Sequence, residues 1–343
     1  MTGPTGTGTA PCHHGELLQG VFADATGHRH RALVTLPMAA PRTRAAFTRR
    51  PDAADIVVHP PDRAKARAAA ALTLAACAPH GPGGGRLVLR GAVPVGLGMG
   101  SSSSDVIATI RAVAASCGRV LPAGTVARLA VRAEGASDPL MLAGGPVLFA
   151  QREGRVLEAL GARLPPALVV GCLTGGGEPV DTLALPDVGC GAADLAEYAR
   201  LRADLRHAVT AVDAGLLGRV ATASARLNQR VLPRPELAVL LRIAARLDAL
   251  GVQVAHSGSV AGLLFDPTRP DLVRRCRRAL AAEGLTPTHL FHTAPDEENE
   301  DVRTHRRRHR PAGPGRHRGR PDLPAVRDHE GGVRAHGGPA PAR

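Results

Sequence analysis

Two hydrophobic patterns share the chain, and together they predict intermixed strands and helices. Short apolar runs that end at proline or glycine are typical of strands, and they occupy 32–38, 55–59, 86–93, 167–174 and 286–291. Apolar residues at helical spacing predict helices over 62–78, 102–117, 122–134, 191–215, 217–231, 235–250 and 270–283. Two further apolar strands surround a loop within 251–266. This mixture predicts the α+β class.

The stretch from Val93 to Cys117 combines a strand end, a glycine loop, a serine cluster and an amphipathic helix. Its glycines expose backbone to a ligand, and they are Gly96, Gly98 and Gly100. Ser101 to Ser104 place hydroxyl and N–H groups at the start of a helix that begins near Ser102. The pattern favours a phosphate site, although such a stretch is often only a turn.

Two further observations narrow the interpretation of this stretch. Ser102 and Asp105 have the spacing of a capping box, which predicts that Asp105 folds back toward the helix start. The loop is not a Walker A loop, because no lysine follows its glycines and the only lysine of the chain is Lys65.

Two carboxylates follow the next helix. Glu134 and Asp138 are separated by a Gly-Ala-Ser turn, and phosphoryl transfer to a hydroxyl needs an oxygen ligand for Mg²⁺ and can use a carboxylate base. The spacing alone favours a structural alternative, in which Glu134 ends a helix and Asp138 is an N-cap before Pro139.

The N-terminal segment carries a cluster of polar residues. Cys12, His13 and His14 are adjacent, so their side chains point to different faces and do not have metal-ligand spacing. Gly15 and Glu16 predict a tight loop between two strands, with Glu16 and Gln19 offering polar groups to a small substrate. A surface hairpin is the alternative.

Two later loops also carry polar residues. Asp181 and Thr182 follow a glycine run and either line an acceptor site or form an Asx turn. His256, Ser257, Gly258 and Ser259 join the two strands of 251–266, where the histidine is either a turn residue or a neighbour of phosphate.

Three of these motifs resemble those of the GHMP small-molecule kinases. The loop from Pro94 reads P-x-x-x-G-x-G-S-S-S, and GMGSSSSD followed by IAT is most similar to the L-threonine kinases of cobalamin and propanediol metabolism. The N-terminal GEL-x-QG and the sequence AHSGSVAGLLF are also similar to that group, and Glu134, Asp138 and 144–149 resemble the catalytic stretch. The resemblance covers residues 10–292.

The resemblance implies a role for each matched position. Nucleotide phosphates would contact the loop residues Pro94, Val95, Gly96, Leu97, Gly98, Met99, Gly100, Ser101, Ser102, Ser103 and Ser104. Leu97 stands where a basic residue is expected. Asp138 would be the catalytic base, and Ser102 and Glu134 the Mg²⁺ ligands. The substrate would contact Gly15, Glu16, Gln19, Asp181, Thr182, His256, Ser257 and Gly258.

The resemblance also implies a two-domain fold. An N-terminal ATP-binding domain similar to ribosomal protein S5 domain 2 would span 1–160, and a ferredoxin-like C-terminal domain would span 161–295. The Arg-, Pro- and Gly-rich tail at 296–343 has no apolar periodicity and is predicted to be disordered.

Composition excludes several other classes. Net charge is +13, but residues 301–343 hold eleven Arg against four acidic residues, so the rest of the chain is only mildly basic and specific nucleic-acid binding is not expected. No run has the roughly 18 apolar residues of a membrane span, and the N-terminus lacks a signal-peptide pattern. The cysteines lack C-x-x-C spacing, which predicts reduced thiols in a cytoplasm.

The sequence therefore predicts an ATP- and Mg²⁺-dependent kinase that phosphorylates the hydroxyl of a small amino acid. L-threonine, giving O-phospho-L-threonine, is the first candidate, and a homodimer is compatible with the sequence. Homoserine or a specialised-metabolite intermediate is an alternative acceptor. An anion- or nucleic-acid-binding protein acting through the basic tail is the alternative of a different class, and only that protein would lose its function on deletion of 297–343.

Overall fold

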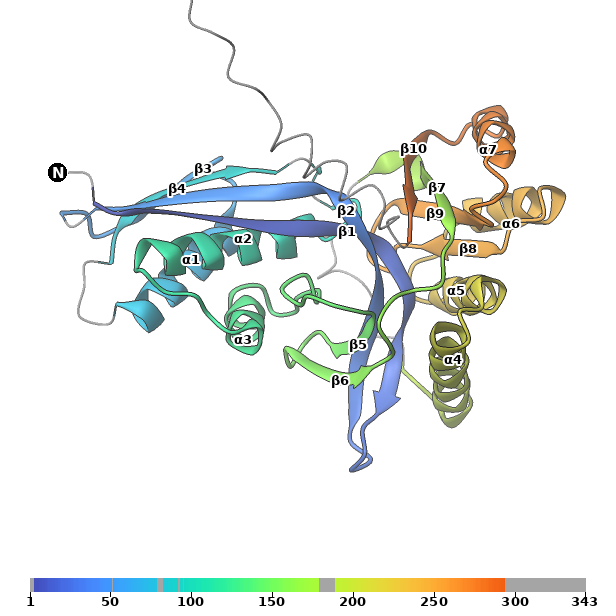
Figure 1. Ribbon diagram of the computed structural model, residues 1–343, viewed down its shortest axis with the longest axis horizontal. Coiled ribbons are helices and arrows are strands. Elements are labelled where there is room, and N and C mark those ends of the chain that lie inside the picture. Colours follow the sequence, from blue (N-terminus) through green and yellow to red (C-terminus); the bar gives the residue numbers. More distant parts are fainter. Residues whose placement is uncertain are drawn as a thin grey trace, which may run out of the picture. The chain divides into compact units, whose positions relative to one another are not determined.

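A ten-stranded sheet runs through the computed structural model, which describes residues 3–50, 52–78, 83–91, 93–94, 96–178 and 189–293 (Figure 1). The strands are β1 (Thr5–Ala23), β2 (Arg29–Arg49), β3 (Ile56–His59), β4 (Gly85–Arg90), β5 (Val147–Ala150), β6 (Arg155–Ala159), β7 (Leu168–Leu173), β8 (Gly251–Val254), β9 (Val260–Phe265) and β10 (Pro287–His292). The helices are α1 (Ala64–Cys77), α2 (Ser101–Ser116), α3 (Ala123–Glu134), α4 (Ala192–Thr210), α5 (Ala214–Asn228), α6 (Glu236–Arg246) and α7 (Asp271–Ala282), and a short 3₁₀ turn covers Gly175–Gly177.

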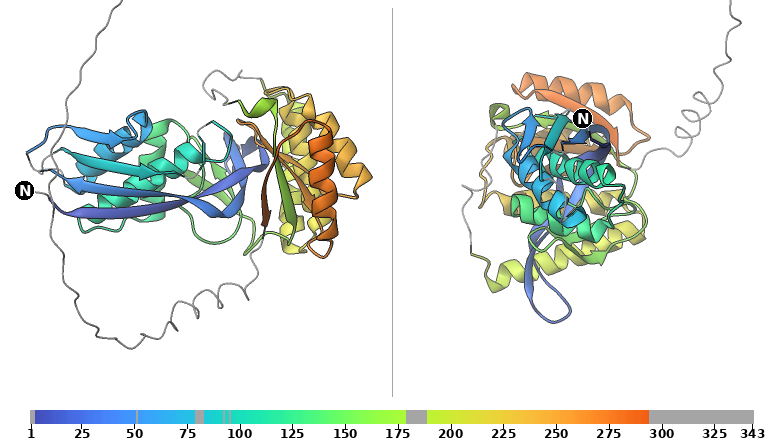
Figure 2. Two further views of the ribbon diagram at one scale, coloured as in Figure 1. Left: turned by 90° about the horizontal axis from the view of Figure 1, so that it is seen from above. Right: turned by 90° about the vertical axis from the view of Figure 1, so that its left-hand side faces the viewer.

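Strands β1 and β2 connect the two halves of the sheet. The strand order is β10-β7-β9-β8-β1-β2-β4-β3, with β5 and β6 attached to β2. The N-terminal part of β1 pairs with the part of β2 that also pairs with β4, whereas Glu16 in the middle of β1 pairs with Val254 of β8. Figure 2 shows both strands running from one group of helices to the other. The fold is mixed α/β, and the boundary near residue 160 stays a prediction.

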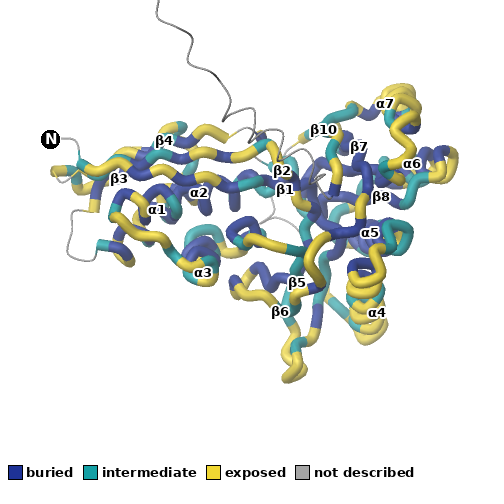
Figure 3. Tube along the Cα trace, in the orientation of Figure 1, coloured by how far each residue is buried: buried dark blue, intermediate teal, exposed yellow. Residues whose placement is uncertain are grey.

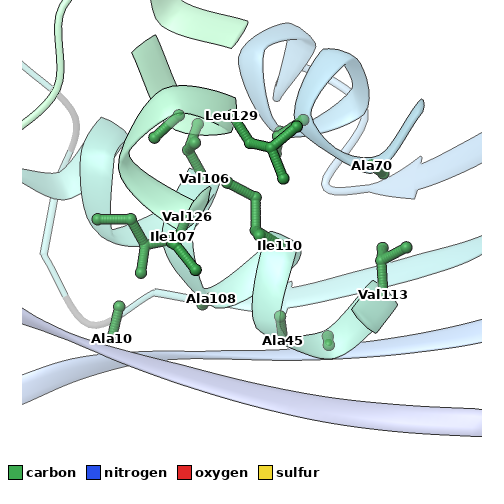
Figure 4. Close-up of a cluster of buried hydrophobic side chains, with 14 of the residues drawn as sticks. Ala10, Ala45, Ala70, Val106, Ile107, Ala108, Ile110, Val113, Val126 and Leu129 are labelled. Atoms are coloured by element: carbon green, nitrogen blue, oxygen red, sulfur yellow. The ribbon is translucent and has the colours of Figure 1, made fainter. Parts of the chain in front are cut away.

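Helices cover each half of the sheet and bury separate apolar clusters. In the N-terminal half, α2 packs between the sheet and the helices α1 and α3, where Val106, Ile110 and Leu129 meet (Figure 4). In the C-terminal half, α6 and α7 bury Leu240 and Leu280 against β7, β8 and β9. Helix α4 keeps one face exposed to solvent (Figure 3). Among the residues described, no helix is long and apolar enough to cross a membrane.

The predicted elements are present with shifted ends, except at the N-terminus. The predicted tight loop at Gly15 and Glu16 is wrong, because β1 continues through both residues. Gly15 has a positive φ of 67°, and the pairing of β1 with β2 shifts register on either side of it, so this segment is an irregularity within one long strand. A loop and a bulge use the same residues, and only pairing on both sides of β1 distinguishes them.

Candidate active site

The glycine loop ends at the start of α2. Gly100 is the N-cap, in the left-handed conformation with φ 66°, and as a glycine it has no side chain to cap the helix. The first N–H groups of a helix lack intrahelical acceptors, and the helix dipole makes this end positive, so it suits a phosphate. The predicted helix start is confirmed to within one residue.

The predicted capping box is wrong. Asp105 lies on the buried side of α2, where its carboxylate accepts a hydrogen bond from Thr43 Oγ1 at 3.1 Å and lies 3.1 Å from Arg63 Nε. A buried carboxylate needs such partners, and they lie on other elements. Asp105 therefore does not fold back onto the first N–H groups of α2.

The serine cluster connects three parts of the site. Ser102 Oγ donates to Glu134 Oε2 at 2.9 Å, and Ser103 Oγ accepts from the Asp138 amide at 3.1 Å. Ser104 Oγ donates to the Ala10 carbonyl in β1 at 3.1 Å. The first turn of α2 thus fixes the end of α3 and the turn that carries Asp138.

Glu134 has the chemistry of a magnesium ligand. Burial, followed by the charge of Asp138, raises the pKa of Glu134 to about 7, and the nearby hydroxyl groups of Ser137 and Ser102 oppose this shift. Its Oε1 atom is buried and, within the described part of the chain, has no hydrogen-bond partner. A carboxylate beside a hydroxyl is an oxygen pair of the kind that Mg²⁺ prefers, so Ser102 and Glu134 fit this ion.

Asp138 forms an ion pair with His13. His13 Nε2 lies 3.1 Å from Asp138 Oδ2, and His13 Nδ1 donates to the Gly15 carbonyl at 3.0 Å. Burial favours neutral imidazole, but the charge and hydrogen bond of Asp138, with a contribution from Glu16, raise the pKa of His13 to about 9. Burial of Asp138 raises its pKa, but the charge and hydrogen bond of His13 outweigh this and hold the pKa of Asp138 below its usual range. The Asp138 side chain is 21% exposed, so a substrate can reach it.

His13 is a residue whose role the sequence reasoning missed. His13, Glu16 and Asp138 each offer a ligand atom, and these atoms lie within 4.8 Å of one another, which is compatible with a bound cation. The raised pKa of His13 favours a protonated imidazole, which repels a cation. We therefore interpret the group as an internal ion pair. The sequence signal was present, since His13 is a histidine in a strand that leads into the site.

Two of the loop glycines also lie against protein neighbours, and their predicted role of exposing backbone to a ligand stays a prediction. A Cβ on Gly100 would lie 2.4 Å from His13 Cδ2, and one on Gly98 would lie 2.4 Å from Ala255 Cβ. Both glycines also have positive φ. Of the other loop residues, Pro94 is exposed, Leu97 and Gly96 are partly buried, Met99 is buried, and Val95 lies outside the described residues.

The loop between β8 and β9 packs on the glycine loop. Ser259 donates its amide hydrogen to the Leu97 carbonyl at 2.9 Å, and a Cβ on Gly258 would lie 2.2 Å from Gly98 Cα. Ser257 in the same loop is partly buried. The structure thus brings the predicted loop at 256–259 together with the predicted phosphate loop.

Two of the remaining predicted substrate residues lie on β1, Glu16 next to His13 and Asp138, and Gln19 three positions further along the strand. Glu16 is 2% exposed, and Gln19 pairs with Leu33 in the β1–β2 ladder. Asp181 and Thr182 lie outside the described residues.

Arg234 is a second residue that the sequence reasoning missed. Its Nη2 donates to the Gly258 carbonyl at 3.1 Å, and Nε is buried without a partner in the described part of the chain. The sequence signal is an arginine between two prolines, Pro233 and Pro235, in a loop. A guanidinium here suits a carboxylate or phosphate.

Comparison with known proteins agrees with this geometry. The model of the GHMP kinases N terminal domain matches residues 64–145, and that of the GHMP kinases C terminal domain matches residues 205–283. An L-threonine kinase of Citrobacter freundii is 31% identical over 196 residues, which is 54% of this chain and 64% of the relative. An L-threonine kinase of Salmonella typhimurium is 30% identical over 215 residues, 59% of this chain and 66% of the relative. The match thus spans slightly less than two thirds of either relative.

Solved structures with low sequence identity share the fold. The homoserine kinase from Cytophaga hutchinsonii superposes with a TM-score of 0.62 at 15% identity, covering 84% of this chain and 94% of that chain. The structure described as MDDEF in complex with MVAPP, AMPPCP and magnesium has a TM-score of 0.63 at 16% identity, with 84% and 97% covered.

Proposed function

Since this chain belongs to the GHMP kinase superfamily, we propose that it transfers the γ-phosphoryl group of ATP to the hydroxyl of a small amino acid, with L-threonine as the first candidate. The observation that carries the proposal is the meeting of Ser102, Glu134 and Asp138 at the first turn of α2. An oxygen pair for Mg²⁺, a carboxylate base and an anion site are the components that phosphoryl transfer to an alcohol uses.

Asp138 is the proposed base. An ionised carboxylate can orient the acceptor hydroxyl and take its proton as the oxygen attacks phosphorus. His13 keeps Asp138 ionised, since the pair lowers the pKa of the carboxyl group. The Asp138 amide bonded to Ser103 holds the carboxylate beside the start of α2.

Ser102 and Glu134 are the proposed Mg²⁺ ligands, since their oxygens lie together and one Glu134 oxygen is buried without a partner among the described residues. The ion, when bound, neutralises charge on the β- and γ-phosphates. The uncapped N-terminus of α2 would bind the phosphates themselves.

The amino-acid acceptor is supported by two separate considerations. Two of the curated relatives are L-threonine kinases, at about 30% identity, and a third, matched over only 100 residues, is a 4-diphosphocytidyl-2-C-methyl-D-erythritol kinase. Arg234, beside Gly258, offers a cation that suits an α-carboxylate. Gly15, Gln19, Asp181, Thr182 and Ser257 remain sequence-based predictions for this site, and homoserine remains an alternative acceptor.

A test of acceptor identity is a screen for ADP release with threonine, serine, homoserine, simple sugars and mevalonate-like acids. We expect turnover with threonine above every other acceptor. An absence of ADP release with all of them would contradict the proposed kinase activity, whereas a preference for homoserine would change only the acceptor.

A test of mechanism uses two variants. Asp138→Asn is expected to lower kcat by about 10² to 10⁴ while ATP binding is retained, because the variant keeps the size of the side chain and removes the base. Ser102→Ala is expected to raise the Mg²⁺ concentration needed for half-maximal rate. Wild-type turnover in the first variant would remove Asp138 from this role, and an unchanged Mg²⁺ titration in the second would exclude Ser102 as a ligand.

A further inference from the structure

Glu16 and His256 form a buried pair between β1 and the loop that follows β8. The His256 amide donates to Glu16 Oε2 at 2.7 Å, and His256 Nδ1 lies 3.4 Å from the same oxygen. The two residues are 2% and 4% exposed. A buried carboxylate is costly without partners, so this contact holds the loop firmly against β1.

The pair extends into a closed circuit of hydrogen bonds. His256 Nε2 lies 2.9 Å from Ser224 Oγ in α5, and Ser224 Oγ accepts from the Gln19 amide in β1 at 3.3 Å. The circuit thus leaves β1 at Glu16 and returns to it at Gln19. Its members come from a strand, a loop and a helix far apart in sequence.

The loop held by this circuit is the one that packs on the glycine loop. Ser259 donates to the Leu97 carbonyl, and Gly258 approaches Gly98 so closely that neither position has room for a Cβ. Two backbones in such contact cannot move independently. A displacement of His256 therefore shifts the residues that precede the start of α2.

We infer that Glu16 and His256 are positioning residues for the nucleotide site rather than contacts for the acceptor. This inference rests on the proposed function and changes the part that the sequence predicted for both residues. Glu16 is 2% exposed and its Oε2 already accepts from the His256 amide, so little of this carboxylate is open to an acceptor group. The contact between Glu16 and His256 instead stabilises the ordered glycine loop before ATP binds.

The first test compares Glu16→Ala with Glu16→Gln. A hydrogen bond to a charged buried group contributes roughly 1.5–3 kcal/mol, so Glu16→Ala should raise KM for ATP and Kd for a non-hydrolysable ATP analogue by about 10- to 100-fold. Glutamine retains an acceptor oxygen and should restore most of that affinity. KM for the acceptor should change less than about threefold, because no acceptor contact is lost.

Ser224→Ala provides a second variant at a distance. It removes the support of His256 Nε2 without touching Glu16, and a smaller rise in KM for ATP is expected. The matched control is Glu158→Gln, which disrupts a carboxylate paired with Arg202 and Arg206 away from the site. This control should lower stability and leave both KM values unchanged.

The outcomes separate the inference from the function it rests on. A raised acceptor KM with unchanged ATP affinity in Glu16→Ala would identify Glu16 as an acceptor contact and overturn the inference. Unchanged values for both substrates in Glu16→Ala and Ser224→Ala would also overturn it. If the wild-type protein itself does not bind the ATP analogue, the proposed function fails first. Calorimetry on Ser224→Ala remains decisive if Glu16→Ala does not fold.

Discussion

Replacing His13 with glutamine tests the electrostatics of the site directly. Glutamine is close to histidine in length and can still donate to Asp138, but it carries no charge. The raised pKa of His13, from 6.5 to about 9, means that coupling to its carboxylate partners exceeds the cost of burying the charge by about 3 kcal/mol. Coulomb's law for charges about 4 Å apart at an effective dielectric constant of about 20 gives a similar value of about 4 kcal/mol.

This coupling sets the size of the expected effect. If the imidazolium charge keeps Asp138 ionised and oriented, loss of that charge should lower kcat by about 10- to 100-fold at pH 7.5. This decrease is smaller than the full coupling energy would give, because glutamine can still donate a hydrogen bond to Asp138. The affinity for ATP should stay within about threefold of the wild-type value, since His13 does not belong to the loop that would bind phosphate.

The pH dependence provides a second readout. The wild-type rate should fall as pH rises through about 9, where His13 loses its proton. His13→Gln should lack this alkaline limb, and His13→Lys should keep a cation and move the limb to higher pH. On the acid side of the pH–rate profile, other groups near Asp138 also titrate, including Glu134 with its pKa of about 7. Rates are therefore measured between pH 7.5 and 10 at saturating Mg²⁺.

A coupled assay for ADP release measures both readouts. His14→Gln is the matched control, because His14 is buried next in sequence and its Nδ1 bonds to Gln253 rather than to a carboxylate. This control should keep the alkaline limb. Wild-type kcat in His13→Gln, together with an unchanged fall in rate above pH 9, would show that the His13 charge does not act on Asp138.

Two further predictions concern stability and packing. Because the folded pKa of His13 lies above 6.5 and that of His14 is lowered to about 4, His13 should contribute a loss of about 3 kcal/mol in the free energy of unfolding as pH rises from 6.5 to 9, and His14 a similar loss as pH falls from 6.5 to 4. The raised pKa of Glu134 acts against the His14 contribution over the acid range, so each variant is compared with the wild type at every pH. Urea titrations should show His14→Gln gaining stability relative to the wild type as pH falls from 6.5 to 4, with the alkaline loss unchanged; parallel curves over the acid range would contradict this assignment. Gly98→Ala should abolish binding of an ATP analogue and lower the unfolding midpoint, since a Cβ would lie 2.4 Å from Ala255 Cβ at a φ of 76°; wild-type calorimetry and thermal melting in this variant would show that the loop can move aside.

The local elements of this protein could be predicted from its sequence. Helices such as α2 and α3 have an apolar stripe, and strands such as β7 and β9 are short apolar runs between turn residues. Both patterns arise from contacts between residues a few positions apart, so they can be recognised in the sequence without the tertiary structure. The same holds for the meeting of glycine loop, serine cluster and helix start, where adjacency in sequence is adjacency in space.

Long-range contacts decided the rest. The sequence around Gly15 fits a loop as well as a bulge, and its pairing with β2 and β8 makes it a bulge. Asp105 has the spacing of a cap, but burial against Thr43 and Arg63 gives it other partners.

The chemistry of the site divides in the same way. Residue types at Ser102, Glu134 and Asp138 allowed phosphate, metal and base roles, and the resemblance to the GHMP kinases was needed to assign them. The ion pair of His13 with Asp138 joins residues 125 positions apart, and the pair of Glu16 with His256 joins residues 240 positions apart. Protonation and hydrogen bonding in a buried site depend on which groups the fold brings within about 4 Å, and spacing along the chain carries no record of that distance.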